Sequence, residues 1–203
     1  MSTTILNWSL EVTQYPVPWT PETVDGVKRR LNLSLTDTTH DVSLSEEIRA
    51  ATLQLENDLN QSFITTGWRY TTSRFPSDGS SIRIPKRPLQ SVTSISYQET
   101  DGSYTVVDPS VYSVDTGRRE IYLNYGQSWP GQTVTTQQAV QIDFNAGYGD
   151  ELTDVPQLIK QCIALQVCKW WRDPAMEDND TSRFDAAYER IVAKLFDQFY
   201  AGG

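Results

Sequence analysis

The first part of the chain has the spacing of apolar residues that is typical of helices. Thr20 to Glu22 supplies an N-cap, a first-turn proline and an early carboxylate for a short helix. Ser43 to Glu46 fits a capping box, and the apolar residues that follow recur every three or four positions, which predicts a second helix that ends near Ser62. Residues 1–19 contain two prolines among aromatic side chains and predict an extended N-terminal arm rather than a regular element.

The middle part, about 63–146, changes to the alternating pattern of β-strands. Val140, Ile142 and Phe144 alternate with polar residues, which predicts a half-buried strand. Shorter strands separated by turn residues are predicted around 68–75, 82–84, 91–98, 104–107, 112–114 and 120–123. Because only turns connect these strands, the pattern indicates antiparallel pairing rather than βαβ units.

The last part is helical again. A wide apolar arc from Leu158 to Trp171 predicts a helix that begins near Pro156 and is buried on more than one side. After an acidic link, Ser182 begins another helix, whose apolar stripe runs to Phe199.

The sequence therefore predicts an α+β protein. The N- and C-terminal helices, about 20–62 and 154–200, are expected to form a helical bundle, with the antiparallel β region inserted between them. Residues 20–203 are expected to form a single domain that follows the arm of residues 1–19.

Charge is distributed unevenly along the 203 residues. The chain has 17 Lys and Arg against 26 Asp and Glu, a net charge of −9. Basic and acidic residues number 4 and 9 in residues 1–62, 7 and 7 in 63–146, and 6 and 10 in 147–203, so the helical parts hold all the excess acid. Such a balance opposes tight binding to nucleic-acid phosphates. No apolar run approaches the ~20 residues of a membrane helix, and the N-terminus has no signal-peptide pattern, so we expect an intracellular protein without membrane association.

Residues able to carry catalysis or hold a metal are few. His40, the only histidine, lies in a polar linker and is expected to be solvated rather than catalytic. Cys162 and Cys168 lie about 120° apart around one predicted helix and are not expected to form a disulfide with each other. Two cysteines do not make a tetrahedral thiolate zinc site, and no nucleotide-binding glycine motif is present. No catalytic, cofactor-binding or metal-binding residue is therefore predicted.

Two local patterns have structural explanations. Gly147-Tyr148-Gly149-Asp150 indicates a junction between a strand and a helix, where glycine permits backbone angles closed to other residues. Residues 69–90 are strongly basic, which fits either a solvated sheet edge or a contact surface for nucleic acid or an acidic partner. The acidic helical parts of neighbouring copies would be such a partner.

A series of short motifs carries a resemblance to a known family. The run from Ile82 to Tyr97, IRIPKRPLQSVTSISY, resembles the pattern L-x-[IL]-P-x-x-P-L-x-S-V-x-S-[IV]-x-Y. It is followed by an acidic-Gly turn at Asp101-Gly102, by Tyr112 to Asp115, by a strand end at Val140 to Gly149, and by a helix start at Val155 to Ile163. In this order, over about residues 43–171, the chain resembles the head–tail connector (adaptor) proteins of long-tailed bacteriophages and gene transfer agents.

The resemblance implies a structural protein of the virion neck with no enzymatic activity and no cofactor. Such adaptors form a homo-oligomeric ring of about twelve subunits, a dodecamer, below the portal protein. The ring receives the stopper or tail-completion protein and extends the channel through which DNA passes without specific binding. The protein would be made in the cytoplasm of the host bacterium.

The resemblance also suggests two contact surfaces. The C-terminal helical region of the family docks on the portal, which here implies Ile191, Leu195, Phe196, Phe199 and Tyr200. A ring needs two different complementary patches on each subunit. The basic residues could form one of them against the acidic helical surface of a neighbour: Arg69, Arg74, Arg83, Lys86 and Arg87.

Two alternatives from other classes remain open. A carbohydrate- or peptide-binding module would use the tryptophans Trp8, Trp19, Trp68 and Trp129 as binding surfaces. A small hydrolase would use the carboxylates of Asp143, Asp150 and Glu151.

Overall fold

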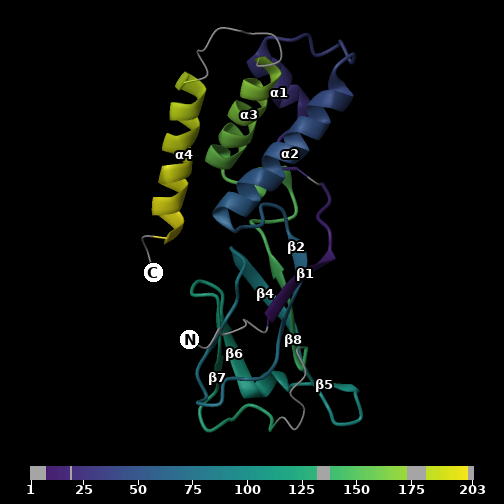
Figure 1. Ribbon diagram of the computed structural model, residues 1–203, viewed down its shortest axis with the longest axis vertical. Helices are drawn as coiled ribbons and strands as arrows, with labels where there is room; N and C mark the ends of the chain where they lie inside the picture. Colours follow the sequence, from purple (N-terminus) through teal and green to yellow (C-terminus); the bar gives the residue numbers. More distant parts are fainter. Residues whose placement is uncertain (1–7, 19, 132–137, 173–181, 201–203) are drawn as a thin grey trace, which may run out of the picture. The chain divides into compact units, whose positions relative to one another are not determined.

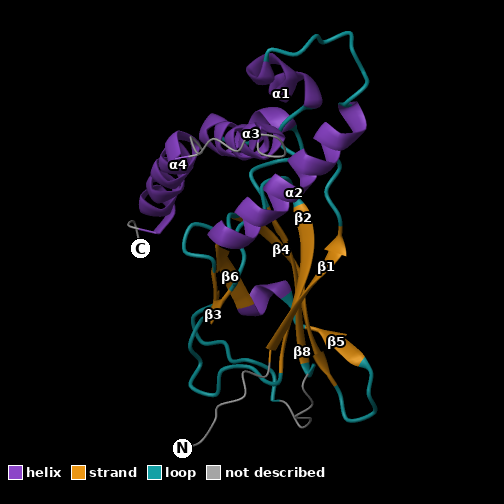
Figure 2. Cartoon of the chain, turned by 45° about the horizontal axis from the view of Figure 1, so that its top comes forward, coloured by secondary structure: helices purple, strands orange, loops and turns teal. Residues whose placement is uncertain are grey.

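The computed structural model divides the chain into a strand unit and a helical unit (Figures 1 and 2). Residues 1–16 and 65–147 belong to the strand unit, and residues 17–64 and 148–203 to the helical unit. The structure describes residues 8–18, 20–131, 138–172 and 182–200, with the backbone alone for 172, 182–185 and 196–200. The predicted grouping of residues 20–203 as one domain stays a prediction.

The strand unit contains two antiparallel sheets. The order of the five-stranded sheet is β1-β2-β8-β4-β5, and that of the three-stranded sheet is β3-β7-β6. The bounds are β1 Trp8–Gln14, β2 Thr66–Thr72, β3 Ile82–Arg83, β4 Leu89–Gln98, β5 Tyr104–Val106, β6 Tyr112–Asp115, β7 Glu120–Leu123 and β8 Val140–Ala146. Strands β2 to β8 confirm the predicted antiparallel β region. Its core holds the inward-facing residues of β8 together with Ile84, Ile95 and Ile121.

Strand β1 was not predicted, and the expectation of an irregular arm is wrong for residues 8–14. Trp8 lies opposite Thr72 and Gln14 opposite Gly67, so β1 extends the sheet along β2. Leu10 packs against the core of the strand unit. The local alternation is weak, and the strand forms because β2, distant in sequence, offers it an open edge. Residues 1–7 and Trp19 lie outside the described residues.

The helical unit joins segments that precede and follow the main β region in one hydrophobic core. Its helices are α1 Val24–Leu31, α2 Asp41–Leu59, α3 Gln157–Arg172 and α4 Ser182–Tyr200. The core contains residues of all four, including Val27, Ile48, Ile163 and Leu195. Together with the antiparallel sheets, these helices confirm the α+β class. Among the described residues, no helix combines the length and the apolar character needed to cross a bilayer.

Both N-terminal helices begin at residues other than the predicted ones. Helix α1 is capped by Thr23, whose hydroxyl accepts a hydrogen bond from the Gly26 amide at 3.0 Å. Helix α2 begins at Asp41 with His40 in the N-cap position, so the capping box predicted from Ser43 does not form. The tertiary partner of Asp41 explains this start, because its carboxylate pairs with the buried Lys28 of α1.

Candidate interaction surfaces

Of the residues considered for catalysis, His40 and Asp143 take part in structural contacts. His40 is exposed, and its ring meets the ring of Trp171 edge-on with centroids 5.0 Å apart. Asp143 is paired with Arg69, whereas Asp150 and Glu151 are exposed residues of the other unit. Within the described part of the chain, no cluster of His, Cys, Asp or Glu is arranged to hold a metal ion. For the hydrolase alternative, the carboxylate of Asp143 is thus already engaged by Arg69.

Arg69 and Asp143 form part of a polar row across the five-stranded sheet. Glu11, Arg69, Asp143 and Ser94 lie opposite one another on β1, β2, β8 and β4. Arg69 donates from Nε to Asp143 Oδ1 at 2.7 Å and from Nη2 to Oδ2 at 3.0 Å. This hydrogen-bonded carboxylate raises the pKa of Arg69 further. The guanidinium is therefore already occupied within its own sheet.

The other four residues of the predicted basic face fall into two groups. Lys86 is buried, and its ammonium lies 4.8 Å from the centroid of the Trp68 ring. Arg74 and Arg83 are exposed, and Arg87 is partly exposed. Arg74 and Arg83 are therefore the members of the set that are fully exposed, whereas Arg69 and Arg87 are partly exposed and Lys86 is buried. Their role between subunits stays a prediction.

Helix α4 presents less of the predicted docking surface than its apolar stripe suggests. Leu195 is 0% exposed and belongs to the core of the helical unit. Ile191 is partly buried and packs against the same core. The side chains of Phe196, Phe199 and Tyr200 lie outside the described residues. In this conformation Leu195 is a core residue, and portal docking by the set stays a prediction.

Three of the four tryptophans named for ligand binding lie in the described residues, and they differ in exposure. Trp8 is 46% exposed and lies beside Tyr70, and Trp68 is half-buried under Lys86. Trp129 is only 9% exposed, and its ring stacks on Phe75 with centroids 4.9 Å apart and planes inclined by 2°. Trp129 is therefore part of the core, as buried tryptophans commonly are.

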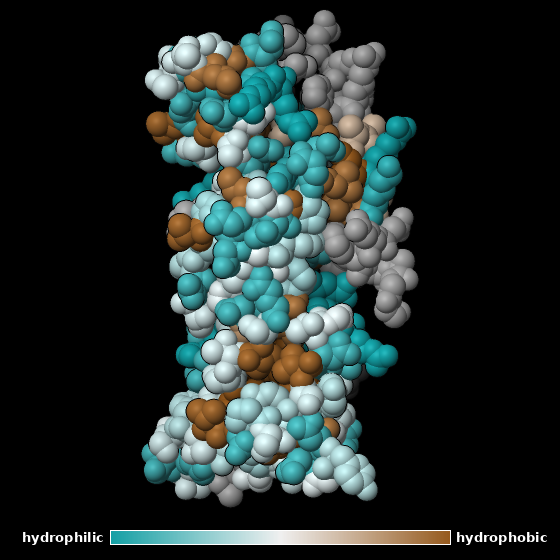
Figure 3. Space-filling model, turned by 180° about the vertical axis from the view of Figure 1, so that it is seen from behind, coloured by the Kyte–Doolittle hydropathy of each residue, from teal (hydrophilic) through white to brown (hydrophobic). Residues whose placement is uncertain are grey.

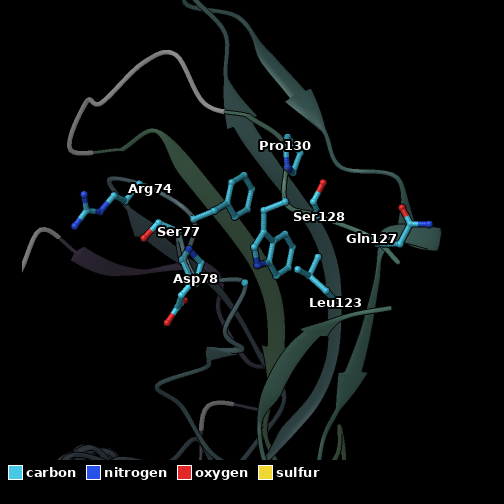
Figure 4. Close-up of a pocket in the computed structure, with 11 residues that line it drawn as sticks. Arg74, Ser77, Asp78, Leu123, Gln127, Ser128 and Pro130 are labelled. Atoms are coloured by element: carbon cyan, nitrogen blue, oxygen red, sulfur yellow. The ribbon is translucent and has the colours of Figure 1, made fainter. Parts of the chain in front are cut away.

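A pocket of about 530 Å³ opens beside this aromatic stack. In Figure 4, Arg74, Ser77 and Asp78 lie along one side of it, and Leu123, Gln127, Ser128 and Pro130 along the other. The sequence did not point to this pocket, because Phe75 and Trp129 lie far apart in the chain and no local pattern links them. Of its lining residues, the sequence had singled out Trp129 for ligand binding and Arg74 for the basic face, but for separate surfaces.

Among the described side chains, the exposed apolar ones lie at separate places along the chain. Figure 3 shows hydrophobic patches separated by hydrophilic residues on the face it presents. The most exposed are Tyr125, Val17 at 81%, Val42 at 72%, Val106 at 61% and Tyr15 at 60%. Exposed apolar residues at separate places are common on proteins, so a contact role needs a complementary site.

The junction after β8 confirms the interpretation of its glycines. Gly147 has a φ of 146°, which side chains other than glycine rarely adopt, and its amide donates to the Pro88 carbonyl at 3.0 Å. A Cβ on Gly149 would collide with the side chain of Asp154. The junction is a structural turn.

The cysteines behave as apolar core residues. Cys162 and Cys168 are both buried and are not joined by a disulfide, as their positions on one helix predicted. Burial, with a smaller contribution from Asp58, raises the pKa of Cys162 to about 12. Burial also raises the pKa of Tyr188, which is close to Cys162 and Asp58.

Comparison with solved structures identifies the fold. A chain from the neck of an empty gene transfer agent (GTA) particle, computed with C6 symmetry, superposes with a TM-score of 0.69 and 24% identity, covering 90% of this chain and 94% of that one. The chain shares the fold of this neck component. The neck of a native GTA particle, computed with C12 symmetry, contains a match with a TM-score of 0.66 and 23% identity, over 90% and 94% of the two chains.

A third match comes from the virion of a native gene transfer agent particle. It has a TM-score of 0.67 and 22% identity, and it covers 89% of this chain and 93% of that one. No protein-family model and no curated protein sequence matches the chain. The fold likeness extends over both units, since about nine-tenths of each chain is covered.

Proposed function

We propose that this chain is a structural, non-catalytic protein of a virion neck, which forms an adaptor ring between the portal protein and the stopper or tail-completion protein. The observation that carries the proposal is the likeness to chains of GTA necks over nearly the whole length of both proteins. The chain would be made in the bacterial cytoplasm and assembled, as a ring of about twelve copies, onto the portal of a filled particle.

The location of the sequence motifs adds independent support. The run from Ile82 to Tyr97 covers β3 and most of β4, and Val140 to Gly149 covers β8 with its glycine junction. Val155 to Ile163 covers the start of α3. The motifs that suggested the adaptor family thus belong to the elements that build the fold, which is where a shared ancestry would leave them.

The charge of the chain suits a channel for DNA. A lumen that binds phosphates tightly would hold the polymer in place, whereas an acidic subunit repels it and lets it slide. The net charge is −9, and the strand region 63–146 is neutral. DNA would therefore pass through the ring without specific binding.

Contacts with neighbours and with the portal complete the proposal. Arg74, Arg83 and the partly exposed Arg87 of the strand unit would face the acidic helical surface of the next copy. Helix α4 would carry the portal contact, with Ile191 and the terminal residues Phe196, Phe199 and Tyr200 at the interface. Leu195 would contribute by fixing the helix to its own core.

Charge reversal tests the ring contact. The double variant Arg83→Glu/Arg87→Glu is expected to reduce ring assembly or attachment to the particle, measured as copies of the chain per purified particle. Arg118→Glu provides a matched control, because Arg118 is an exposed arginine of the same unit. Normal incorporation of the double variant would remove these arginines from the interface.

Deletion of the gene tests the function itself. Particles made without the chain are expected to be full heads that lack tails, seen by electron microscopy. Expression of the chain from a plasmid should restore the tails. Tailed particles of normal number in the deletion strain would refute the neck role, and a small-molecule activity lost on Asp150→Asn would favour the hydrolase instead.

A further inference from the structure

Strand β1 leaves an unprotected edge on the five-stranded sheet. It pairs with β2 on one side and, among the described strands, with none on the other (Figure 2). Proteins usually protect such an edge by a short strand, a lysine, a proline or a bulge. The opposite edge, β5, has only three residues. In β1 the pairing is irregular only between Val12 and Gln14, so residues 8–12 form a regular edge that contains neither lysine nor proline.

The apolar side chains along this edge are incompletely covered. Trp8, Leu10 and Val12 alternate along β1 and therefore share one face of the sheet. Leu10 packs against the core of the strand unit, but Leu10 and Val12 are only half-buried, and Trp8 is 46% exposed. An added β-strand would pair with the open backbone groups of the edge and cover this apolar row.

The segment Trp-Ser-Leu-Glu-Val of the edge is complementary to itself when two copies run in opposite directions. Antiparallel pairing centred on Leu10 places Leu10 opposite Leu10 and Trp8 opposite Val12, and an aromatic residue opposite a β-branched one stabilises a sheet. The same register places Ser9 opposite Glu11. A hydroxyl donor then lies beside a carboxylate acceptor, and no two like charges oppose each other.

We propose that the edge of β1 pairs with the same edge of a second copy of this chain, in a dimer whose two-fold axis passes through the pair of Leu10 residues. The two five-stranded sheets join into one continuous sheet with both core faces on the same side. A two-fold contact uses the same patch on both copies, whereas the contact in a cyclic ring is head-to-tail. The dimer is therefore a state of the free chain, and it does not depend on the proposed neck function.

Charge substitutions at Ser9 test the register of this pairing. Ser9→Lys is expected to tighten the dimer by attraction to Glu11 of the second copy, and Ser9→Glu to weaken it by repulsion. The two-fold axis makes the pair occur twice, so the dissociation constants of the two variants should differ by about tenfold. The variants are matched, because both lose the hydrogen bond between the Ser9 and Thr71 hydroxyls.

Sedimentation equilibrium of the full chain measures these dissociation constants. The concentration should reach about 1 mM, because an interface of one short strand from each copy is small and therefore weak. A chain that stays monomeric at this concentration, or equal constants for the two Ser9 variants, would overturn the proposal. Oligomers larger than a dimer would indicate a head-to-tail contact instead and would overturn it as well.

Disulfide trapping tests the centre of the pairing. Leu10→Cys places two cysteines directly opposite each other, at the Cα separation of about 4.5–5.5 Å that a disulfide accepts. Mild oxidation is expected to link the copies into a covalent dimer, while the native cysteines are buried. Val106→Cys, at a β5 valine that is 61% exposed, is the control and should not link. No linking of Leu10→Cys, or equal linking of both variants, would contradict pairing at Leu10.

Discussion

Removing the charge of Lys28 should destabilise the helical unit by an amount that its surroundings allow us to work out. Lys28 is 1% exposed, its ammonium pairs with the Asp41 carboxylate, and it donates to the Asp37 carbonyl at 2.7 Å. Lys28→Met keeps most of the side-chain volume and leaves Asp41 without its cation. Breaking a fully buried pair in this way costs about 3–5 kcal/mol. Asp41 is 36% exposed and keeps part of its hydration, so we expect a loss of about 2 kcal/mol.

Urea unfolding followed by the helical circular dichroism signal measures this loss. A loss of about 2 kcal/mol corresponds to a fall in Tm of at least about 8 °C for a unit of this size. Adding Asp41→Asn removes the orphaned charge, so the double variant should recover about 1 kcal/mol. Lys194→Met, on the exposed surface of α4, is the control and should change stability by less than about 0.5 kcal/mol. A loss below about 0.5 kcal/mol for Lys28→Met, or a double variant no more stable than the single one, would refute the reasoning.

Three further predictions follow from the geometry. Gly147→Ala should lower the free energy of unfolding, measured in urea, by about 1–3 kcal/mol, because the φ of Gly147 is 146°. Gly131→Ala is the control and should change it little, because a Cβ there meets nothing within 4 Å. Equal effects of the two variants would contradict the role of the backbone angle. Arg69→Met should cost about 1 kcal/mol by leaving the partly buried Asp143 unpaired, and a double-mutant cycle with Asp143→Asn should show coupling between the two. The thiol of Cys162 should resist thiol reagents at pH 8 in the native protein and react in denaturant. The pKa of Cys162 is about 12 in the folded protein, above the value of about 8.5 for an unfolded thiol, so the thiol of the unfolded state ionises first as pH rises. The free energy of unfolding should therefore fall by up to about 1.4 kcal/mol per pH unit between about pH 9 and 12. A flat urea midpoint between pH 8 and 10.5, or the same slope in Cys162→Ala, would contradict this.

The periodicity of apolar residues by itself determined the class of the fold and most of its elements. Alternation at Val140, Ile142 and Phe144 became the inward-facing side of β8, and strands predicted as neighbours along the chain paired as β4 with β5 and as β6 with β7. The order of short motifs pointed to neck adaptors, and the fold of GTA neck chains agrees with it. These properties are local, because side-chain alternation and turn chemistry are decided by residues close in sequence.

Only the tertiary structure decided which predicted surface residues remain on the surface. Lys86 is buried with its ammonium over the Trp68 ring, and Leu195 lies in the core, although both were assigned to contact surfaces; Arg69 stays partly exposed but is paired with Asp143. It also decided that residues 8–14 complete a sheet and that Phe75 and Trp129 stack beside a pocket. Each of these outcomes depends on a partner far away in sequence, and no local pattern specifies which distant side chain will fill a given space. Sequence therefore determined the elements, and packing between them determined the sites.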